Sequence, residues 1–542
     1  MTQTRCGAVA LVEALSAQGV TTIFGVPGEE TTALLSAIED SDIDFVLCRH
    51  EQAAAFMASV HGRIIGKPAV CLATLGPGAT NLVTGVADAQ LDHVPVIALT
   101  GQANRGRLKR ESHQVVDLEA LFAPVTKLSR TLIVADDIPA SVAEAVRVCT
   151  HEKPGAVHLC LPEDVAAEES SAPIVPMRPL RFGPPAVESV SEVAAALKEA
   201  KRPVLVAGAG VLRADAVDDV RRFVDQTQIP LVTTFMAKGI LPPDHLQMLF
   251  SVGQPEDDII DHALEAADLI VTIGFDPVEY ATSKLTFENS PVAALSLTAA
   301  PVDSGWHVKA EATGDLRQTL TMLSDTLEGT DWPPCPTFTA VRDGMVRHLS
   351  RDGGKASDGT VSPHDLCACI SRVIRPEDTV LSGVGLHKLW VAREVMAKRA
   401  GQIIVPNGLA GMGLALPGAI AAARVQSEGR VLAICGDGDV MMNVQEMETA
   451  ARLGLRLTVM VWEDGGYGLI DEHQDHHDPF SFANPVWSKL AHSFGWTYAN
   501  AETADGAQQL LQSGLSAEGP TLISVSVDYA ASGGMPTVEN AA

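Results

Sequence analysis

Two acidic residues in the last third of the chain have the types and spacing of a cation-binding pair. Asp437 lies between glycines in GDGD, directly after the apolar run VLAIC, and Asp464 ends the next apolar run, LRLTVMVWED. Two carboxylates at the ends of neighbouring strands could hold Mg²⁺ against phosphate oxygens, because Mg²⁺ takes about six oxygen ligands, commonly including one or two carboxylates. The backbone carbonyl of Gly466 is a candidate third ligand. The alternative is a β-turn with unrelated surface acids, and a lone GDG does not decide between the two.

A glutamate and two glycine-rich turns near the N-terminus form a second set. FGVPGEE at 24–30 and ATLGPGATN at 73–81 each follow an apolar run and lead into a helical pattern. Glycine lets the backbone approach a ligand there, and the following helix presents its N-terminal end to an anion. Glu51 opens a helix in RHEQAAAFMA. Alone, it is explained by the favourable placement of a carboxylate at a helix N-terminus, which contributes about 0.3–1 kcal/mol.

The elements that carry these residues alternate between short apolar strands and amphipathic helices. Such alternation is typical of α/β units, each with a doubly wound parallel sheet covered by helices on both faces. Proline-rich stretches at 170–185 and 328–336 break the pattern and read as linkers. We therefore predict three domains and a loose C-terminal tail, at residues 1–170, 186–330, 358–530 and 531–542. Strands are expected at 21–26, 43–48, 68–74, 94–101, 202–210, 229–235, 267–274, 292–298, 379–383, 401–407, 430–438 and 455–462.

Composition limits the function classes. A net charge of −28 and a pI near 4.9 argue against a nucleic-acid-binding protein, which would carry a basic surface. Nine dispersed cysteines without a CxxC pair indicate reduced thiols. No apolar run approaches the ~20 residues of a membrane span, and the N-terminus lacks the continuous apolar core of a signal peptide. We expect a cytoplasmic protein with no nucleic-acid or membrane partner.

Taken together, the motifs resemble one enzyme family. FGVPGEE, RHEQAAAFMA, ATLGPGATNL and GDGDVMMNVQEMETAARLGL with WEDGGYG are similar, in this order over about residues 5–530, to the thiamine-diphosphate (ThDP) enzymes of the acetolactate synthase-like branch. The resemblance implies pyrimidine-binding, central and diphosphate-binding domains. It also implies ThDP and Mg²⁺ as cofactors, small 2-keto acids as substrates, and a dimer or tetramer in which the cofactor lies between the first domain of one subunit and the third of its partner.

The resemblance also assigns roles to individual residues. Glu51 matches the glutamate that activates the aminopyrimidine by proton exchange, and Gln114 matches a second residue of the catalytic pocket. Met412 matches the apolar wedge that bends the cofactor, although core packing alone would also explain a methionine there. The implied metal ligands are Asp437, Asp464 and Gly466, and the implied pocket residues are Lys127, Ile470 and His473. Further implied cofactor contacts are Pro27, Gly28, Gly76, Asn81, Gly385, Gly438, Asp439, Asn443 and Tyr467.

Three segments bear on which reaction is catalysed. Residues 105–129 and GFDPVEY at 274–280 resemble the catabolic, FAD-independent acetolactate synthases, so FAD is not expected. VAGAG at 206–210 could be mistaken for a dinucleotide motif, but a bare GxG is weak. Ser112-His113-Gln114 stands where decarboxylases of the family carry a His-His pair. We therefore expect decarboxylation of pyruvate followed by addition of the two-carbon unit to a second 2-keto acid.

Other readings remain open at this stage. The His-rich segment 473–477 could shape an unusual acceptor pocket, bind a metal or form a polar loop, and a similar run occurs in carboxyethylarginine synthase, so a carboligase with another acceptor is an alternative. A 2-keto acid decarboxylase and an inactive scaffold are the others. Glu463 adds a charge beside the expected diphosphate. Because neighbouring strand residues point to opposite faces, we predict that Glu463 turns away from the metal, toward solvent or a helix N-terminus.

Overall fold

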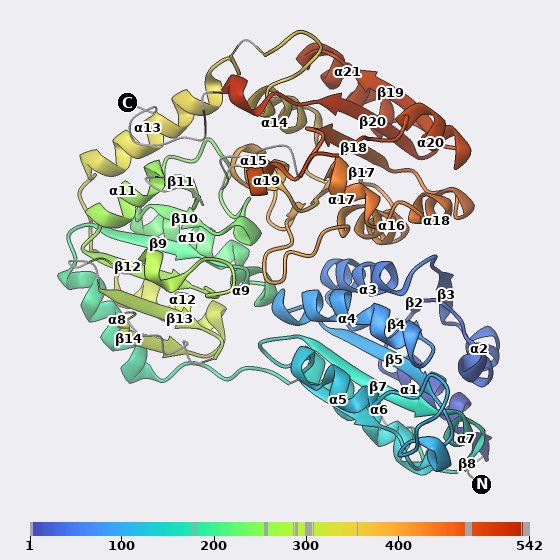
Figure 1. Cartoon of the computed structure of the whole chain (residues 1–542). Helices are drawn as coiled ribbons and strands as arrows, with labels where there is room; N and C mark the ends of the chain where they lie inside the picture. Colours follow the sequence, from blue (N-terminus) through green and yellow to red (C-terminus); the bar gives the residue numbers. More distant parts are fainter. Residues whose placement is uncertain are drawn as a thin grey trace.

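The computed structural model describes three sheet-containing domains (Figure 1). Each domain contains one six-stranded parallel sheet with helices on both faces, and the four strands expected in each unit form, joined by two further strands per sheet. Within the described residues, no helix is both long and apolar enough to span a membrane. The described residues are 4–174, 176–177, 180–253, 258–285, 287, 291–298, 306, 308–354, 356–471, 480–532 and 534.

The first domain has the strand order β3-β2-β4-β5-β7-β6. Its central strands are fully buried, as expected of a parallel sheet covered on both faces. A short antiparallel pair, β1 (Arg5–Cys6) with β8 (Glu169–Ser170), joins the two ends of the domain. The other elements are α1 (Gly7–Ala17), β2 (Thr22–Gly25), α2 (Thr32–Glu39), β3 (Asp44–Leu47), α3 (Glu51–Ile65), β4 (Ala69–Ala73), α4 (Pro77–Leu91), β5 (Val96–Gln102), α5 (Leu118–Phe122), β6 (Leu128–Thr131), α6 (Ile138–Thr150), β7 (Ala156–Pro162) and α7 (Glu163–Ala167).

The central domain has the order β11-β10-β9-β12-β13-β14. Its core is a single cluster of buried apolar side chains that includes residues of helix α13, so this helix packs on the domain although it follows the second linker. The elements are α8 (Val187–Glu199), β9 (Pro203–Ala207), α9 (Gly210–Arg213), α10 (Val217–Thr227), β10 (Leu231–Thr233), β11 (Met248–Ser251), α11 (Ile259–Ala266), β12 (Leu269–Ile273), β13 (Val292–Ser296), β14 (Val308–Thr313), α12 (Leu316–Thr326) and α13 (Pro336–Ser350).

The third domain has the order β16-β15-β17-β18-β20-β19. β17 and β18 are neighbours, so the residues that follow them meet at the same edge of the sheet. The elements are α14 (Pro363–Val373), β15 (Thr379–Ser382), α15 (Leu386–Glu394), β16 (Ile403–Ile404), α16 (Ala415–Val425), β17 (Val431–Gly436), α17 (Asp437–Met441), α18 (Glu446–Arg452), β18 (Thr458–Glu463), α19 (Gly468–Asp471), α20 (Trp487–Ser493), β19 (Thr497–Ala501), α21 (Ala504–Leu515) and β20 (Thr521–Ser526).

Buried charged groups connect the central domain to both of its neighbours. Asp276 of the central domain is fully buried and meets His93 Nε2 at 2.7 Å and Lys153 Nζ at 2.9 Å, both from the first domain. Asp258 is equally buried and pairs at 2.7 Å with Arg393 of the third domain. Breaking such a pair leaves an uncompensated buried charge, which costs about 3–5 kcal/mol. These contacts therefore fix how the domains sit against one another.

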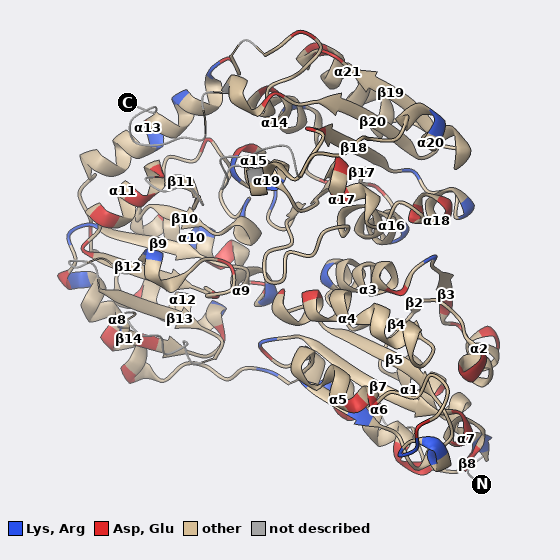
Figure 2. Ribbon diagram, viewed as in Figure 1, with Lys and Arg blue, Asp and Glu red and all other residues tan. Residues whose placement is uncertain are grey.

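The first and third domains are also joined directly. They share one apolar cluster, in which α3 packs against α16. Asp92, at the end of α4, accepts hydrogen bonds from Asn407 N at 3.2 Å and Gly408 N at 2.6 Å and pairs with Arg63 at 2.9 Å. Figure 2 shows charged residues mainly on the outer helices and loops, whereas the sheets are largely free of them.

A buried glutamate links three helices of the molecule's upper part. Glu394, at the end of α15, accepts hydrogen bonds from His348 Nε2 of α13 and His364 Nδ1 of α14, each at 2.7 Å. Burial alone would raise the pKa of Glu394, but these two histidines lower it to about 2. Among the described residues this is the one group of three potential metal ligands in close proximity. The 2.7 Å separations are hydrogen-bond distances, so Glu394 joins the two histidines through direct hydrogen bonds.

Candidate cofactor site

Glu51 lies at the carboxyl edge of the first sheet, where β3 ends and α3 begins. Its side chain is buried, and Oε2 accepts a hydrogen bond from Asn81 Nδ2 at 2.9 Å. Asn81 belongs to α4, which begins after β4, so two neighbouring strand-to-helix turns bring these residues together. A Cβ on Gly78 would lie 3.2 Å from Glu51 Oε1, which leaves little space for a larger side chain beside the carboxylate.

Both glycine turns around Glu51 are tightly packed. A Cβ on Gly28 would lie 2.3 Å from Thr74 Cβ, so the turn after β2 sits directly against the turn after β4. Gly76 has φ +52°, and a Cβ there would lie 2.7 Å from Gln114 O. Gln114 itself is exposed and has φ +58°. The structure therefore gathers Gly28, Gly76 and Gln114 along the edge that carries Glu51, and Pro27 is exposed in the first of these turns.

Asp437 and Asp464 meet at the carboxyl edge of the third sheet. Asp437 is buried, and its two oxygens accept hydrogen bonds from Gly438 N at 2.8 Å and Gly465 N at 2.9 Å. Burial, followed by the nearby Asp437 carboxylate, raises the pKa of Asp464 to about 7. A Cβ on Gly468 would come within 2.6 Å of Asp464 Oδ2. Asp464 is exposed at this edge. Two close carboxylates beside glycine backbone are a donor set suited to a hard cation such as Mg²⁺.

Glu463 is connected to this pair through an asparagine. Its Oε2 accepts hydrogen bonds from Trp487 Nε1 at 2.7 Å and from Asn484 Nδ2 at 3.2 Å, so it points toward the beginning of α20. Asn484 Nδ2 also donates to Asp437 Oδ2 at 2.8 Å. One amide therefore bridges Glu463 and an expected metal ligand, a link that strand alternation does not reveal.

His387 was not identified from the sequence, yet it occupies the same region. Gly385 precedes α15, and a Cβ on either Gly385 or Gly436 would lie about 3 Å from the His387 ring. His387 is buried, and its Nε2 has no hydrogen-bond partner. Burial, with Lys388 next in importance, lowers the pKa of His387 to about 3, so the imidazole is neutral. Nδ1 is the ring nitrogen that lies against the two glycine turns, so it is the one placed to meet an oxygen-rich ligand such as a diphosphate there.

Met412 is half-buried on a loop. The next residue, Gly413, is hydrogen-bonded through both its backbone N–H and its carbonyl group. Gly413 N donates to Asp439 Oδ1 at 2.8 Å, and Gly413 O accepts from Asn443 Nδ2 at 2.9 Å. Asp439 Oδ1 also accepts from Val384 N at 3.0 Å. Both polar side chains are buried. Asp439 and Asn443, expected to contact the cofactor, thus bind the backbone of the loops that carry Met412 and Gly385.

The Asp439 side chain occupies space that only a glycine at position 383 leaves free. A Cβ on Gly383 would lie 1.8 Å from Asp439 Oδ2 and 2.6 Å from its Cγ. Asp439 Oδ2 has no hydrogen-bond partner, and burial raises the pKa of Asp439 to about 6. The two residues therefore fit together as a pair.

The remaining expected residues fall into three groups. Tyr467 is 39% exposed, and its ring lies against Gly438, where a Cβ would come within 2.9 Å of Tyr467 Cε1. Ile470 is exposed on α19, and His473 lies outside the described residues. Lys127 directly precedes β6, at the amino edge of the first sheet, and its Nζ donates to the carbonyls of His151 and Lys153 at 2.6 Å each. Within the chain, Lys127 is not brought together with Glu51.

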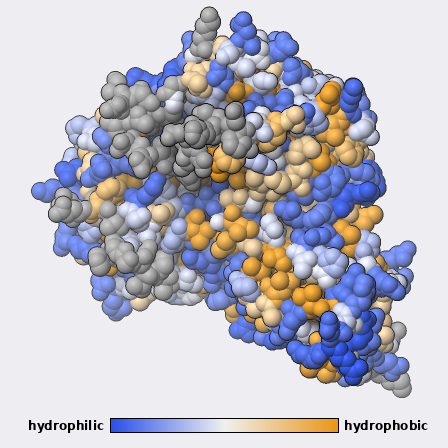
Figure 3. All heavy atoms as spheres, in the orientation of Figure 1, coloured by the Kyte–Doolittle hydropathy of each residue, from blue (hydrophilic) through white to orange (hydrophobic). Residues whose placement is uncertain are grey.

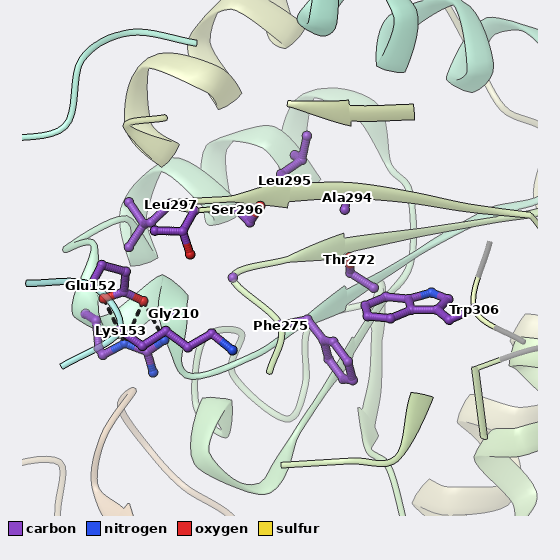
Figure 4. A pocket seen from close by; sticks show the side chains of 13 residues that line it. Glu152, Lys153, Gly210, Thr272, Phe275, Ala294, Leu295, Ser296, Leu297 and Trp306 are labelled. Atoms are coloured by element: carbon purple, nitrogen blue, oxygen red, sulfur yellow. Dashed lines mark hydrogen bonds and ion pairs between the residues drawn. The ribbon is translucent and has the colours of Figure 1, made fainter. Parts of the chain in front are cut away.

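The central domain has its own pocket at the carboxyl ends of β12 and β13, the edge where doubly wound sheets bind dinucleotides (Figure 4). Glu152 from the first domain lines this pocket and pairs with Arg213 at 2.8 Å. A Cβ on Gly208 or Gly210 would come within 2.6 Å of Gly274 O. The glycines of VAGAG therefore allow two backbone segments to pack closely.

Comparison with known proteins agrees with this geometry. Three family models match in order: the N-terminal thiamine pyrophosphate (TPP)-binding domain of TPP enzymes at residues 5–121, their central domain at 190–323 and their C-terminal TPP-binding domain at 383–525. The chain is 31% identical to an acetolactate synthase of Bacillus subtilis over 533 residues, covering 96% of this chain and 93% of that protein.

Two further relatives are also similar over nearly their whole length. A catabolic acetolactate synthase of Raoultella terrigena is 30% identical, and the large subunit of acetolactate synthase isozyme 2 of Escherichia coli is 32% identical; each comparison covers 96% of this chain and 95% of the relative. Because the family's three domains and its relatives extend over the length of the chain, the protein belongs to the thiamine diphosphate (thiamine pyrophosphate) enzymes and is an acetolactate synthase-like member of that family.

Proposed function

We propose that this protein is a Mg²⁺-dependent carboligase that forms 2-acetolactate from pyruvate. Two pyruvate anions and one proton give one 2-acetolactate anion and one CO₂. The observation that carries the proposal is the pairing of Glu51 with Asn81 at one sheet edge and of Asp437 with Asp464 at another. Relatives called acetolactate synthase, similar over the whole chain, support the same reaction.

The chain's own residues would divide the work as follows. Bound ThDP supplies the nucleophilic carbon that adds to a 2-keto acid and makes loss of CO₂ possible. Glu51, buried and oriented by Asn81, would exchange a proton with the cofactor's aminopyrimidine. Asp437 and Asp464 would hold Mg²⁺ against the diphosphate, with Gly466 O as a further ligand. His387 Nδ1, which lies against Gly385 and Gly436, would face the diphosphate.

We further propose that two subunits share each cofactor. Large apolar side chains are exposed near the expected site and on the first domain: Leu91, Leu409, Met441, Met442 and Tyr467 are each 37–44% exposed. Figure 3 shows hydrophobic residues gathered at the centre of one face, where the domains meet, and over the first domain. Contiguous apolar surface of this kind is typical of a protein interface. A homodimer or homotetramer would cover it.

Two finer expectations remain part of the proposal. The proposal that the protein does not bind FAD is supported by the central-domain pocket. There the VAGAG glycines pack on Gly274, and the Glu152–Arg213 ion pair lines the pocket. A cytoplasmic location is supported by the nine cysteines, all of which are free thiols.

The decisive experiment is a product screen of purified protein with ThDP and Mg²⁺. Pyruvate is supplied alone and then with 2-ketobutyrate, an aldehyde or an amine, and the products are identified by mass spectrometry. We expect acetolactate from pyruvate alone, converted to acetoin by acid. Acetaldehyde as the sole product would instead identify a decarboxylase, and turnover that requires an amine would identify a carboligase with another acceptor. No turnover of any substrate by protein that binds ThDP would favour a scaffold. Flavin absorbance in active enzyme would overturn the expectation on FAD.

A further inference from the structure

A large cavity lies on the central domain at the opposite edge from its dinucleotide-type pocket. It has a volume of about 440 Å³, within the usual range for small-molecule sites. Its lining includes Pro203, the first residue of β9, Pro230, which directly precedes β10, and Leu249 in β11. These positions mark the amino edge of the sheet. β9 alone separates this edge from the carboxyl edge by about 16 Å, at roughly 3.3 Å per residue.

One wall of the cavity is apolar and fixed in place. It is formed by the second linker and the first turn of α13, with Trp332, Pro333, Pro334 and Phe338 among the lining residues. Trp332 Nε1 donates to Leu197 O at 3.3 Å and to Ala200 O at 3.1 Å, at the end of α8. Its polar edge is therefore occupied, and the indole is held in one orientation. A flat apolar surface of this kind suits an aromatic or aliphatic ligand body.

The rim of the cavity contributes further apolar surface. Leu246 also lines the cavity and is 75% exposed, the most exposed of the large apolar side chains in the described part of the chain. A ligand body that reached Leu246 would remove this surface from water, which favours binding by about 25 cal/mol for each Å² buried.

The charged residues of the lining are mainly cationic, although the protein is strongly acidic, and the neutral polar residues there are Gln228, Gln247 and Thr339. Lys201, Arg202 and Arg342 line the cavity with one carboxylate, Asp343, whereas the whole chain has 39 Lys and Arg against 67 Asp and Glu. Arg342 is anchored by bonds from Nε and one terminal nitrogen to His245 O and Asp244 O, at 3.3 and 3.2 Å. Its other terminal nitrogen lies 3.9 Å from Asp343, a loose ion pair. A guanidinium has five N–H donors, so a ligand would share Arg342 with Asp343.

The loop that carries Lys201 and Arg202 is also anchored. Arg202 Nε donates to Ala266 O at 2.7 Å. The carboxylate of Asp268 accepts hydrogen bonds from the backbone N–H groups of Lys201 and Arg202, at 2.9 and 2.8 Å. This acid is therefore engaged with the backbone, and the loop carries its two cations in a fixed position. Lys201 is exposed at the mouth of the cavity.

We propose that this cavity binds a small organic anion with an apolar body and an acidic head group. The body lies against Trp332 and the linker prolines, and the head group is held by Lys201, Arg202 and Arg342. The site is separate from the cofactor site, because none of its lining residues belongs to the first or third domain.

The test uses full-length protein saturated with ThDP and Mg²⁺, and anilinonaphthalene sulfonate as the probe. We expect saturable binding with energy transfer from tryptophan to the probe, and a smaller transfer in Trp332→Phe, because five of the six tryptophans remain. Lys201→Glu should weaken binding by about fivefold or more, because two units of charge change near the head group. Lys67→Glu, an exposed lysine of the first domain, makes the same charge change at a remote position and should leave the dissociation constant within twofold. Melting curves show whether each variant is folded.

Phenylnaphthylamine, which has the same body without the sulfonate, provides the second comparison and should bind much more weakly. Equal effects of Lys201→Glu and Lys67→Glu, or equal binding of the neutral and the anionic probe, would overturn the proposal. If Lys201→Glu does not fold, Arg342→Gln replaces it, and the comparison between the two probes on unmodified protein still decides the question.

Discussion

Replacing Gly383 with alanine should destabilise the third domain only when Asp439 is also present. The new Cβ would lie 1.8 Å from Asp439 Oδ2, so the carboxylate must move. Its other oxygen accepts the backbone N–H groups of Val384 and Gly413. Each buried N–H left without a partner costs about 1–3 kcal/mol, so Gly383→Ala should cost roughly 2–6 kcal/mol.

Asp439→Ala loses the same two bonds but also removes a buried carboxyl group. Its pKa rises from 3.8 to about 6 on burial, which corresponds to roughly 3 kcal/mol of destabilisation at neutral pH. The net cost of Asp439→Ala should therefore be small. In that background the Cβ at position 383 meets no carboxylate, so adding Gly383→Ala should cost less than about 1 kcal/mol. The coupling between the two sites should be at least about 1 kcal/mol.

The assay is the dissociation constant for ThDP, measured by calorimetry for the wild type, both single variants and the double variant. Asp439 holds the loops next to Gly385 and Met412, so a displaced carboxylate must return before the cofactor binds. A cost of about 2 kcal/mol would then raise the dissociation constant for ThDP roughly thirtyfold. Gly519→Ala, with open space around its Cβ, is the matched control and should be neutral. The steric reasoning would be refuted if Gly383→Ala weakened ThDP binding equally with and without Asp439, or if it left ThDP binding of the wild type unchanged.

Three further predictions follow from the site and from the buried network. Glu51→Gln should reduce turnover by about 10²-fold or more, as expected for loss of a general acid–base group, while ThDP still binds; full turnover would exclude the proposed role. Asp437→Asn should weaken Mg²⁺ activation, measured as the metal concentration that restores half the activity after chelation; an unchanged requirement would place the metal elsewhere. The pKa of Glu394 is depressed to about 2, so its stabilisation, roughly 3 kcal/mol, is present above pH 4.5 and is lost as the pH falls toward 2. The melting temperature should therefore fall less between pH 6 and pH 3 in Glu394→Gln than in the wild type, and parallel curves would contradict this.

The residues at the ends of strands were accessible from the sequence. Glu51 and Asn81 are thirty positions apart, yet Glu51 begins α3 after β3 and Asn81 lies near the start of α4 after β4, and parallel strands bring such positions to one edge. The same logic identified Asp437 and Asp464. Each sheet nevertheless has two strands more than were expected. The partly exposed strands β6 and β19 lack a continuous apolar run, whereas β7, β11 and β20 are buried strands that the expectation omitted.

Other parts depended on tertiary contacts that no local pattern encodes. Similarity of the segment around Lys127 to a pocket region does not tell which edge of the sheet the lysine occupies, and the structure places it where β6 begins. Asp439 was expected to contact the cofactor, and the motif does not reveal that its side chain binds the backbone N–H groups of Val384 and Gly413. Asp437 precedes α19 in the sequence and Asn484 follows it, so their hydrogen bond is seen only in the folded chain.

The buried ion pairs between domains bear on how this architecture can be recombined. A central domain transplanted into a relative would bring Asp258 and Asp276 without Arg393, His93 and Lys153, unless the recipient has the same cations. Each acid would then face a neighbouring domain unpaired and would have to take up a proton. Functional chimeras should therefore arise mainly when the crossover points carry both sides of these pairs, and the family's three domains are not freely interchangeable modules in this chain.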